Sequence, residues 1–116
     1  MEISLLEGIA FISSQGIILK DEQSALDIIA DASYQTGSNL IALHKENVAE
    51  ECFKLSSGLL GAILQKFVNY RVRLAIMGDF SQYSSKPLKD FIYESNKGGH
   101  IYFVKDEKEA VKNLKN

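Results

Sequence analysis

The sequence predicts one α/β domain over residues 1–116, with a mostly parallel sheet of about five strands and about four helices. Short apolar runs recur along the chain without polar alternation, which is typical of strands covered on both faces. Amphipathic segments that begin at a hydroxyl or carboxylate residue separate the later runs. A helix between strands is the connection that neighbouring parallel strands require. The expected order is therefore β-β-α-β-α-β-α-β-α.

Length, charge and cysteine content exclude several classes of protein. The chain has 116 residues, 46% of them hydrophobic and 24% charged, and its net charge is −2. Positive and negative residues are interspersed and nearly balance, so the sequence shows no basic patch of the kind that binds nucleic acid. No apolar run approaches the roughly 20 residues of a membrane helix. The single cysteine, Cys52, cannot form an internal disulfide bond, which fits a reducing compartment. We expect a cytoplasmic protein that binds neither nucleic acid nor membranes.

The first part of the chain predicts two paired strands, a helix and a buried strand. Residues 1–6 and 9–13 are short apolar segments that we expect to pair at one edge of the sheet. Asp21 is placed to cap the next helix and Gly37 to end it. Residues 39–44 contain four consecutive apolar side chains, as a strand covered on both faces would.

The middle of the chain predicts a short helical turn and then the main helix. Asn47 followed by Glu50 has the spacing of a capping box, which favours a turn over residues 48–53. The main helix is expected to begin at Ser56 or Ser57. Its apolar residues recur at helical spacing and form a wide stripe: Leu59, Leu60, Ile63, Leu64, Phe67 and Val68.

The last part repeats the alternation of strand and helix. Residues 73–77 and 100–104 are apolar runs that predict two further strands. Between them, Ser84 or Ser85 is placed to cap a helix. Asp106 is placed to cap a closing helix in the same way.

The start of the main helix resembles a known motif. Ser56-Ser57-Gly58-Leu59, followed by Gly61-Ala62-Ile63-Leu64, is similar to the signature of STAS domains, the family of anti-sigma-factor antagonists. In this sequence Leu55 stands where the family has aspartate, and Leu60 is an additional residue. The resemblance implies the order of strands and helices given above. It also implies a single-domain regulator in which a partner kinase phosphorylates the first serine of the motif, Ser56.

A second resemblance covers nearly the whole chain. Residues 61–70, 74–80 and 89–96 are similar to a small bacterial family, domain of unknown function 4180. This resemblance implies the same fold and a bacterial origin, and it implies no activity.

The exits of parallel strands share one edge of a sheet, where open α/β proteins tend to bind ligands. The polar loop 78–85, which carries two aromatic residues, follows one such exit. We expect this edge to form a ligand or partner surface. Its candidate residues are His44, Asp79, Phe80, Ser81 and Tyr83.

Two interpretations of Ser56 and Ser57 remain open. Either serine can simply cap the helix, and the same position also suits a phosphorylated serine or a bound anion. The favoured function is a non-enzymatic regulatory or interaction module, with a protein partner or a second copy of itself. The alternative is a small-molecule-binding protein or minor enzyme that uses the strand exits.

Catalytic and metal-binding patterns are weak. Ser56, His44 and Asp79 provide the residue types of a hydrolase triad, but the nucleophile elbow Gly-x-Ser-x-Gly is absent. Cys52 and the two histidines lack the spacing of metal ligands. The acidic neighbours of Cys52 disfavour a reactive thiolate, so we expect a structural, partly buried cysteine. Neither a metal nor a cofactor is expected.

Overall fold

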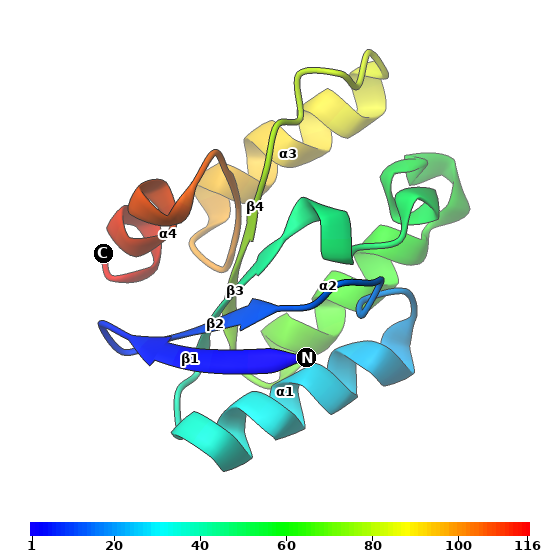
Figure 1. Ribbon diagram of the computed structural model, residues 1–116. Helices are drawn as coiled ribbons and strands as arrows, with labels where there is room; N and C mark the ends of the chain where they lie inside the picture. Colours follow the sequence, from blue (N-terminus) through cyan, green and yellow to red (C-terminus); the bar gives the residue numbers. More distant parts are fainter.

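The computed structural model describes residues 1–116 and contains one five-stranded sheet in the order β1-β2-β3-β4-β5 (Figure 1). The first strand runs antiparallel to the second, and all other neighbours are parallel. The predicted mostly parallel sheet is confirmed. Its strands are β1 (Glu2–Leu6), β2 (Ile9–Ser13), β3 (Leu40–His44), β4 (Arg73–Met77) and β5 (Ile101–Val104).

The edge hairpin also matches the prediction. Leu6 pairs with Ile9, so Glu7 and Gly8 alone form the turn. Both have positive φ angles, 53° and 79°. A two-residue turn with two positive φ angles matches the right-handed twist of the strands that it joins.

The helices lie on both faces of the sheet. They are α1 (Glu22–Thr36), α2 (Leu59–Asn69), α3 (Lys86–Gly98) and α4 (Glu107–Leu114). The first three pack on one face and α4 packs on the other, which Figure 1 shows for α2 and α4. Successive strand residues point to opposite faces. Accordingly Ile41 and Leu43 belong to the larger core beneath α1–α3, and Ala42 belongs to the smaller core beneath α4. No helix is both long and apolar enough to cross a membrane.

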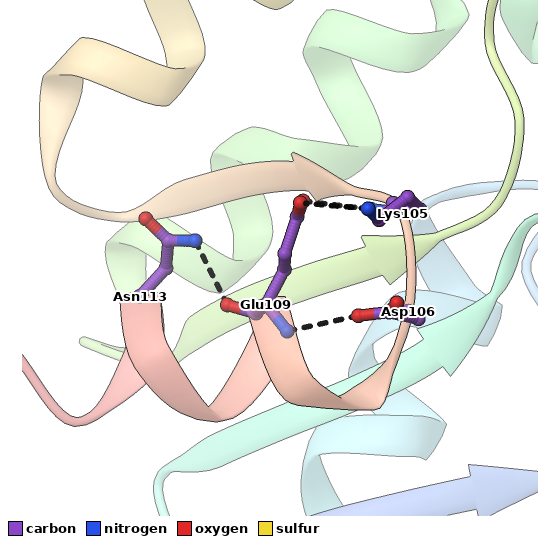
Figure 2. Close-up of polar contacts among 4 residues, drawn as sticks. All are labelled: Lys105, Asp106, Glu109 and Asn113. Carbon is purple, nitrogen blue, oxygen red and sulfur yellow. Dashed lines mark hydrogen bonds and ion pairs between the residues drawn. The ribbon is translucent and has the colours of Figure 1, made fainter.

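Three helix starts confirm the caps expected from the sequence. Asp21 accepts a hydrogen bond of 2.8 Å from the Ser24 N–H, and Ser85 accepts one of 3.4 Å from the Leu88 N–H. At α4, Asp106 accepts from the Glu109 N–H at 3.0 Å (Figure 2). These side chains satisfy N–H groups that the first turn of a helix leaves without partners.

Figure 2 shows the polar contacts in and just before α4. The Glu109 carboxylate accepts from the Lys105 N–H at 3.1 Å and lies 3.8 Å from the Lys105 ammonium. One turn later, the Asn113 amide donates to the Glu109 carbonyl at 2.8 Å. The start of α4 is therefore held by contacts within a few residues of sequence.

The prediction of a capping box at Asn47 is wrong. Asn47 is 3% exposed, and its side-chain amide donates to the Ser14 and Gly16 carbonyls at 2.9 Å each. The expected turn within residues 48–53 is present as the 3-10 turn Glu50–Phe53, and a second 3-10 turn, Lys45–Asn47, precedes it. Asn47 therefore holds the loop after β2 in place. The residues that it joins are more than 30 positions apart in the sequence.

The start of α2 also differs from the prediction. The helix begins at Leu59, and a 3-10 turn, Leu55–Ser57, precedes it. Gly58 is the N-cap residue, with a φ angle of 74° that favours glycine. Its left-handed backbone interrupts the helical conformation one or two residues after the predicted start.

Arg73 fastens the end of α4 to the sheet. Its guanidinium donates to the carbonyls of Gly99, Leu114 and Asn113 at 2.9, 2.5 and 3.1 Å, and to the Tyr102 hydroxyl at 2.8 Å. A cation at the carboxyl end of a helix also meets the negative end of the helix dipole. Arg73 thereby connects the first residue of β4 with the last turn of the chain.

Candidate functional site

The exits of β3, β4 and β5 share one edge of the sheet. His44 pairs with Met77, and Met77 pairs with Val104, so the three strands end side by side. Beyond them the chain leaves in two directions, because α3 follows β4 on one face and α4 follows β5 on the other. Such a change of direction leaves a crevice between neighbouring strand exits.

Two grooves lie at these exits. The first, here called the α3-side groove, has a volume of about 570 Å³ and is lined by Asp79, Phe80, Ile92, Phe103 and Lys105, among others. The second, the α4-side groove, has a volume of about 270 Å³. Its lining includes His44, Glu46, Lys105, Asp106 and Glu107. The structure therefore brings His44 to one groove and Asp79 with Phe80 to the other.

An aromatic cluster packs between the strand exits and the 3-10 turns. Its members are Phe53, Phe80, Tyr83 and Phe103. The Phe53 ring stacks on Tyr83 with a centroid distance of 5.1 Å, and Phe80 meets Phe103 edge to face at 5.3 Å. The Tyr83 hydroxyl donates a hydrogen bond of 2.7 Å to the Glu50 carboxylate. Burial raises the pKa of Tyr83, and the Glu50 carboxylate raises it further. Tyr83 therefore remains a protonated donor.

The contributions of Phe53 and Glu50 were absent from the sequence prediction. Glu50 and Tyr83 are 33 residues apart, and Phe53 lies in a different turn from the loop that it contacts. The sequence does signal that this loop is apolar in part, through Phe80 and Tyr83. It contains no signal for the residues against which they pack.

The Asp79 carboxyl group is held in its ionised form. Its Oδ1 atom accepts a hydrogen bond of 2.9 Å from the Ser81 N–H. The side chain of Ser81 and then its backbone N–H lower the pKa of the Asp79 carboxyl below its ordinary value. Asp79 is exposed and therefore carries a negative charge at neutral pH. Ser81 acts here by orienting Asp79.

The structure assembles no hydrolase triad from the expected residues. His44 makes no hydrogen bond to Asp79 or to a serine, and Asp79 uses its carboxylate on Ser81. Ser56 and Ser57 line neither groove. A nucleophile must lie within hydrogen-bonding reach of its base, and these residues do not meet that requirement.

Ser56 and Ser57 lie in the 3-10 turn before α2, and both are exposed. The Ser57 hydroxyl accepts a hydrogen bond of 3.1 Å from the Leu59 N–H, whereas the Ser56 hydroxyl makes none. Gly58, the N-cap residue of α2, has no side chain that could cap the N–H groups of the first turn. The capping interpretation thus applies to Ser57 and leaves Ser56 free.

Cys52 is fully buried, rather than partly buried as expected from the sequence. Burial is the main cause that raises the pKa of its thiol, and the nearby Glu51 carboxylate adds to the effect. Both effects favour the neutral thiol, as expected for a structural cysteine. No group of three or more histidine, cysteine, aspartate or glutamate side chains is clustered as metal ligands.

Gly78 permits the close contact between two strand exits. A Cβ atom at this position would lie 2.6 Å from the Lys45 Cβ and 3.1 Å from its Cδ. The Lys45 ammonium in turn lies 5.2 Å from the centroid of the Tyr83 ring. We expect Gly78→Ala to force the two exits apart and to lower the free energy of unfolding by about 1–3 kcal/mol, measured by urea denaturation.

Gly61 offers a matched control for this substitution. It lies within α2, and a Cβ atom there would meet nothing within 4 Å. Gly61→Ala should therefore raise the free energy of unfolding by about 0.5–1 kcal/mol, because alanine is the better helix former. Equal stability of Gly78→Ala and the unmodified protein would show that Lys45 moves aside without cost.

Comparison with known proteins agrees with this fold. A crystal structure from Thermotoga maritima, described as an anti-sigma factor antagonist, matches with a TM-score of 0.52 and 12% sequence identity, over 99% of this chain and 94% of that one. At this identity the similarity shows a shared fold, and the predicted STAS-like architecture is confirmed. No curated protein matches the sequence significantly. The family model described as domain of unknown function (DUF4180) matches residues 7–114, and the chain belongs to that family.

Proposed function

We propose that this protein is a cytoplasmic, non-enzymatic regulatory module that binds a protein partner or a second copy of itself, and that phosphorylation of Ser56 controls the binding. The observation that carries the proposal is the exposed Ser56 hydroxyl, which makes no hydrogen bond and precedes a helix start that lacks a side-chain cap. The STAS-like fold supports it, since the similar structure is described as an anti-sigma factor antagonist.

The chemistry of this helix start favours a phosphate. Unpaired N–H groups and the positive end of the helix dipole stabilise an anion. Here the phosphate would lie against the first turn of α2, where Gly61 is exposed and Gly58 has no side chain in the way. A phosphate added to an exposed surface also changes the charge that a partner meets. Ser56 can therefore combine a stable modified state with an altered binding surface.

The test compares Ser56→Asp with Ser56→Ala in the native bacterial host. We expect phosphoserine at position 56 in the unmodified protein, and a change of about tenfold in the amount of a co-purified partner between the two variants. Quantitative mass spectrometry of cross-linked complexes measures both. Light scattering at several concentrations measures whether self-association responds to the same substitution.

Ser33 provides the control for added charge. It is an exposed serine near the end of α1, where it lines a groove with Tyr70 at the opposite end of α2 from Ser56. Ser33→Asp should leave the partner set unchanged. Identical partners and identical self-association for both Ser56 variants, together with no phosphoserine at that position, would reject the proposal.

A further inference from the structure

The α3-side groove has the size and position of a ligand site. Its volume of about 570 Å³ lies within the range of about 300–1,000 Å³ that is usual for small-molecule pockets. It opens beside the exits of β4 and β5, where the following helices leave to opposite faces of the sheet. Ligands of open α/β sheets bind at such positions.

The lining of the groove combines an apolar floor with charged residues. Phe80, Ile92 and Phe103 provide side chains from the loop after β4, from α3 and from β5. Phe80 and Ile92 are only half-buried, and the edge-to-face contact of Phe80 with Phe103 fixes the Phe80 ring. A half-exposed aromatic surface that is held rigid favours a flat apolar body, because neither partner loses much conformational freedom on contact.

Carboxylates outnumber ammonium groups in and around the groove, although its lining itself carries one of each, and Lys45 also lies close enough to Asp79 to lower its pKa. The Asp79 carboxylate is exposed and accepts a hydrogen bond from the Ser81 N–H through its Oδ1 atom. Lys105 is the one cation of the lining, and its ammonium lies 3.8 Å from the Glu109 carboxylate. The adjoining α4-side groove adds the carboxylates of Asp106 and Glu107. A ligand cation therefore meets an ionised acceptor, whereas a ligand anion meets several carboxylates around the single lysine of the lining.

We propose that the α3-side groove binds a small molecule with a flat aromatic body and a cationic amine. The aromatic body lies on Phe80 and Ile92, and the amine donates to the exposed carboxylate of Asp79. The aromatic face of Phe80 adds attraction for the same cation. The inference is independent of the proposed phosphorylation, since neither Ser56 nor Ser57 lines this groove.

Three probes with the same indole body and different charges test the ligand class: tryptamine, tryptophol and indole-3-propionate. Two-dimensional NMR of the nitrogen-15-labelled protein locates each probe and measures its affinity. We expect tryptamine to shift the resonances of Gly78, Phe80 and Phe103, and to bind about tenfold more tightly than the neutral tryptophol. Indole-3-propionate should bind most weakly. Equal affinities for the three probes, or shifts confined to other residues, would overturn the proposal.

Asp79→Asn removes the charge and keeps an oxygen that can accept from the Ser81 N–H. This variant should bind tryptamine about tenfold more weakly and tryptophol unchanged. Asp31→Asn is the control, because Asp31 is an exposed carboxylate on α1 and does not line the groove. If Asp31→Asn weakens tryptamine binding as much as Asp79→Asn does, the attraction comes from the net charge of the protein, and the site assignment fails. Absence of tryptamine binding at millimolar concentrations also rejects it.

Discussion

Arg73→Ala is expected to lower the free energy of unfolding by about 3 kcal/mol and to release α4 from the sheet. The substitution removes every hydrogen bond from the guanidinium to the carbonyls of Gly99, Asn113 and Leu114. It also removes the cation from the carboxyl end of α4. Because α4 has only eight residues, its stability depends on these tertiary contacts rather than on its own propensity.

Urea denaturation measures the loss of stability, and limited trypsin digestion measures the release of α4. Lys108 and Lys112 are exposed residues within α4, and cleavage after them should become faster once the helix is released. Arg73→Lys keeps the charge but loses the planar fork of donors, so its stability should fall between those of the alanine variant and the unmodified protein. Arg71→Ala is the matched control, since Arg71 is exposed and forms no hydrogen bond through its side chain. Equal trypsin resistance of Arg73→Ala and Arg71→Ala would contradict the anchoring role.

Local interactions explain why much of the fold could be predicted. Asp21, Ser85 and Asp106 cap helices through N–H groups three residues away, so their roles are visible in a short window of sequence. The edge hairpin is equally local, because Glu7 and Gly8 alone form its turn. Arg73 and Asn47 act over more than 25 residues of sequence, and no local pattern distinguishes them from surface residues.

The position of α4 illustrates a second limit of prediction. The right-handed crossover rule applies to a helix that connects two parallel strands. It explains why α1, α2 and α3 share one face of a sheet whose strands follow one another in sequence order. The closing helix α4 connects no further strand, so packing alone selects its face. Sequence reasoning therefore predicts the shared edge of strand exits and misses the two grooves that the opposite departures of α3 and α4 create.

Asn47→Asp is expected to lower the free energy of unfolding at neutral pH by about 3–5 kcal/mol, the cost of an unpaired buried charge. In the unmodified protein the Asn47 amide donates to the Ser14 and Gly16 carbonyls, and its Oδ1 atom has no partner. A carboxylate at this position would place negative oxygens against two carbonyl oxygens in a site that is 3% exposed. The loop after β2 would lose its attachment and gain a repulsion.

The same variant should recover stability as the pH falls. Burial and the two carbonyls raise the pKa of the introduced carboxyl above its unfolded value of about 3.9. The folded state then binds the proton more tightly than the unfolded state does, so stability is lost as the pH rises through the folded pKa. Urea denaturation at about pH 5 and about pH 7.5 should show a smaller difference from the unmodified protein at the lower pH. Asn47→Ala, which lacks the carboxyl, should show the same difference at both. A pH-independent difference for Asn47→Asp would mean that water reaches this position and that the loop opens without the amide.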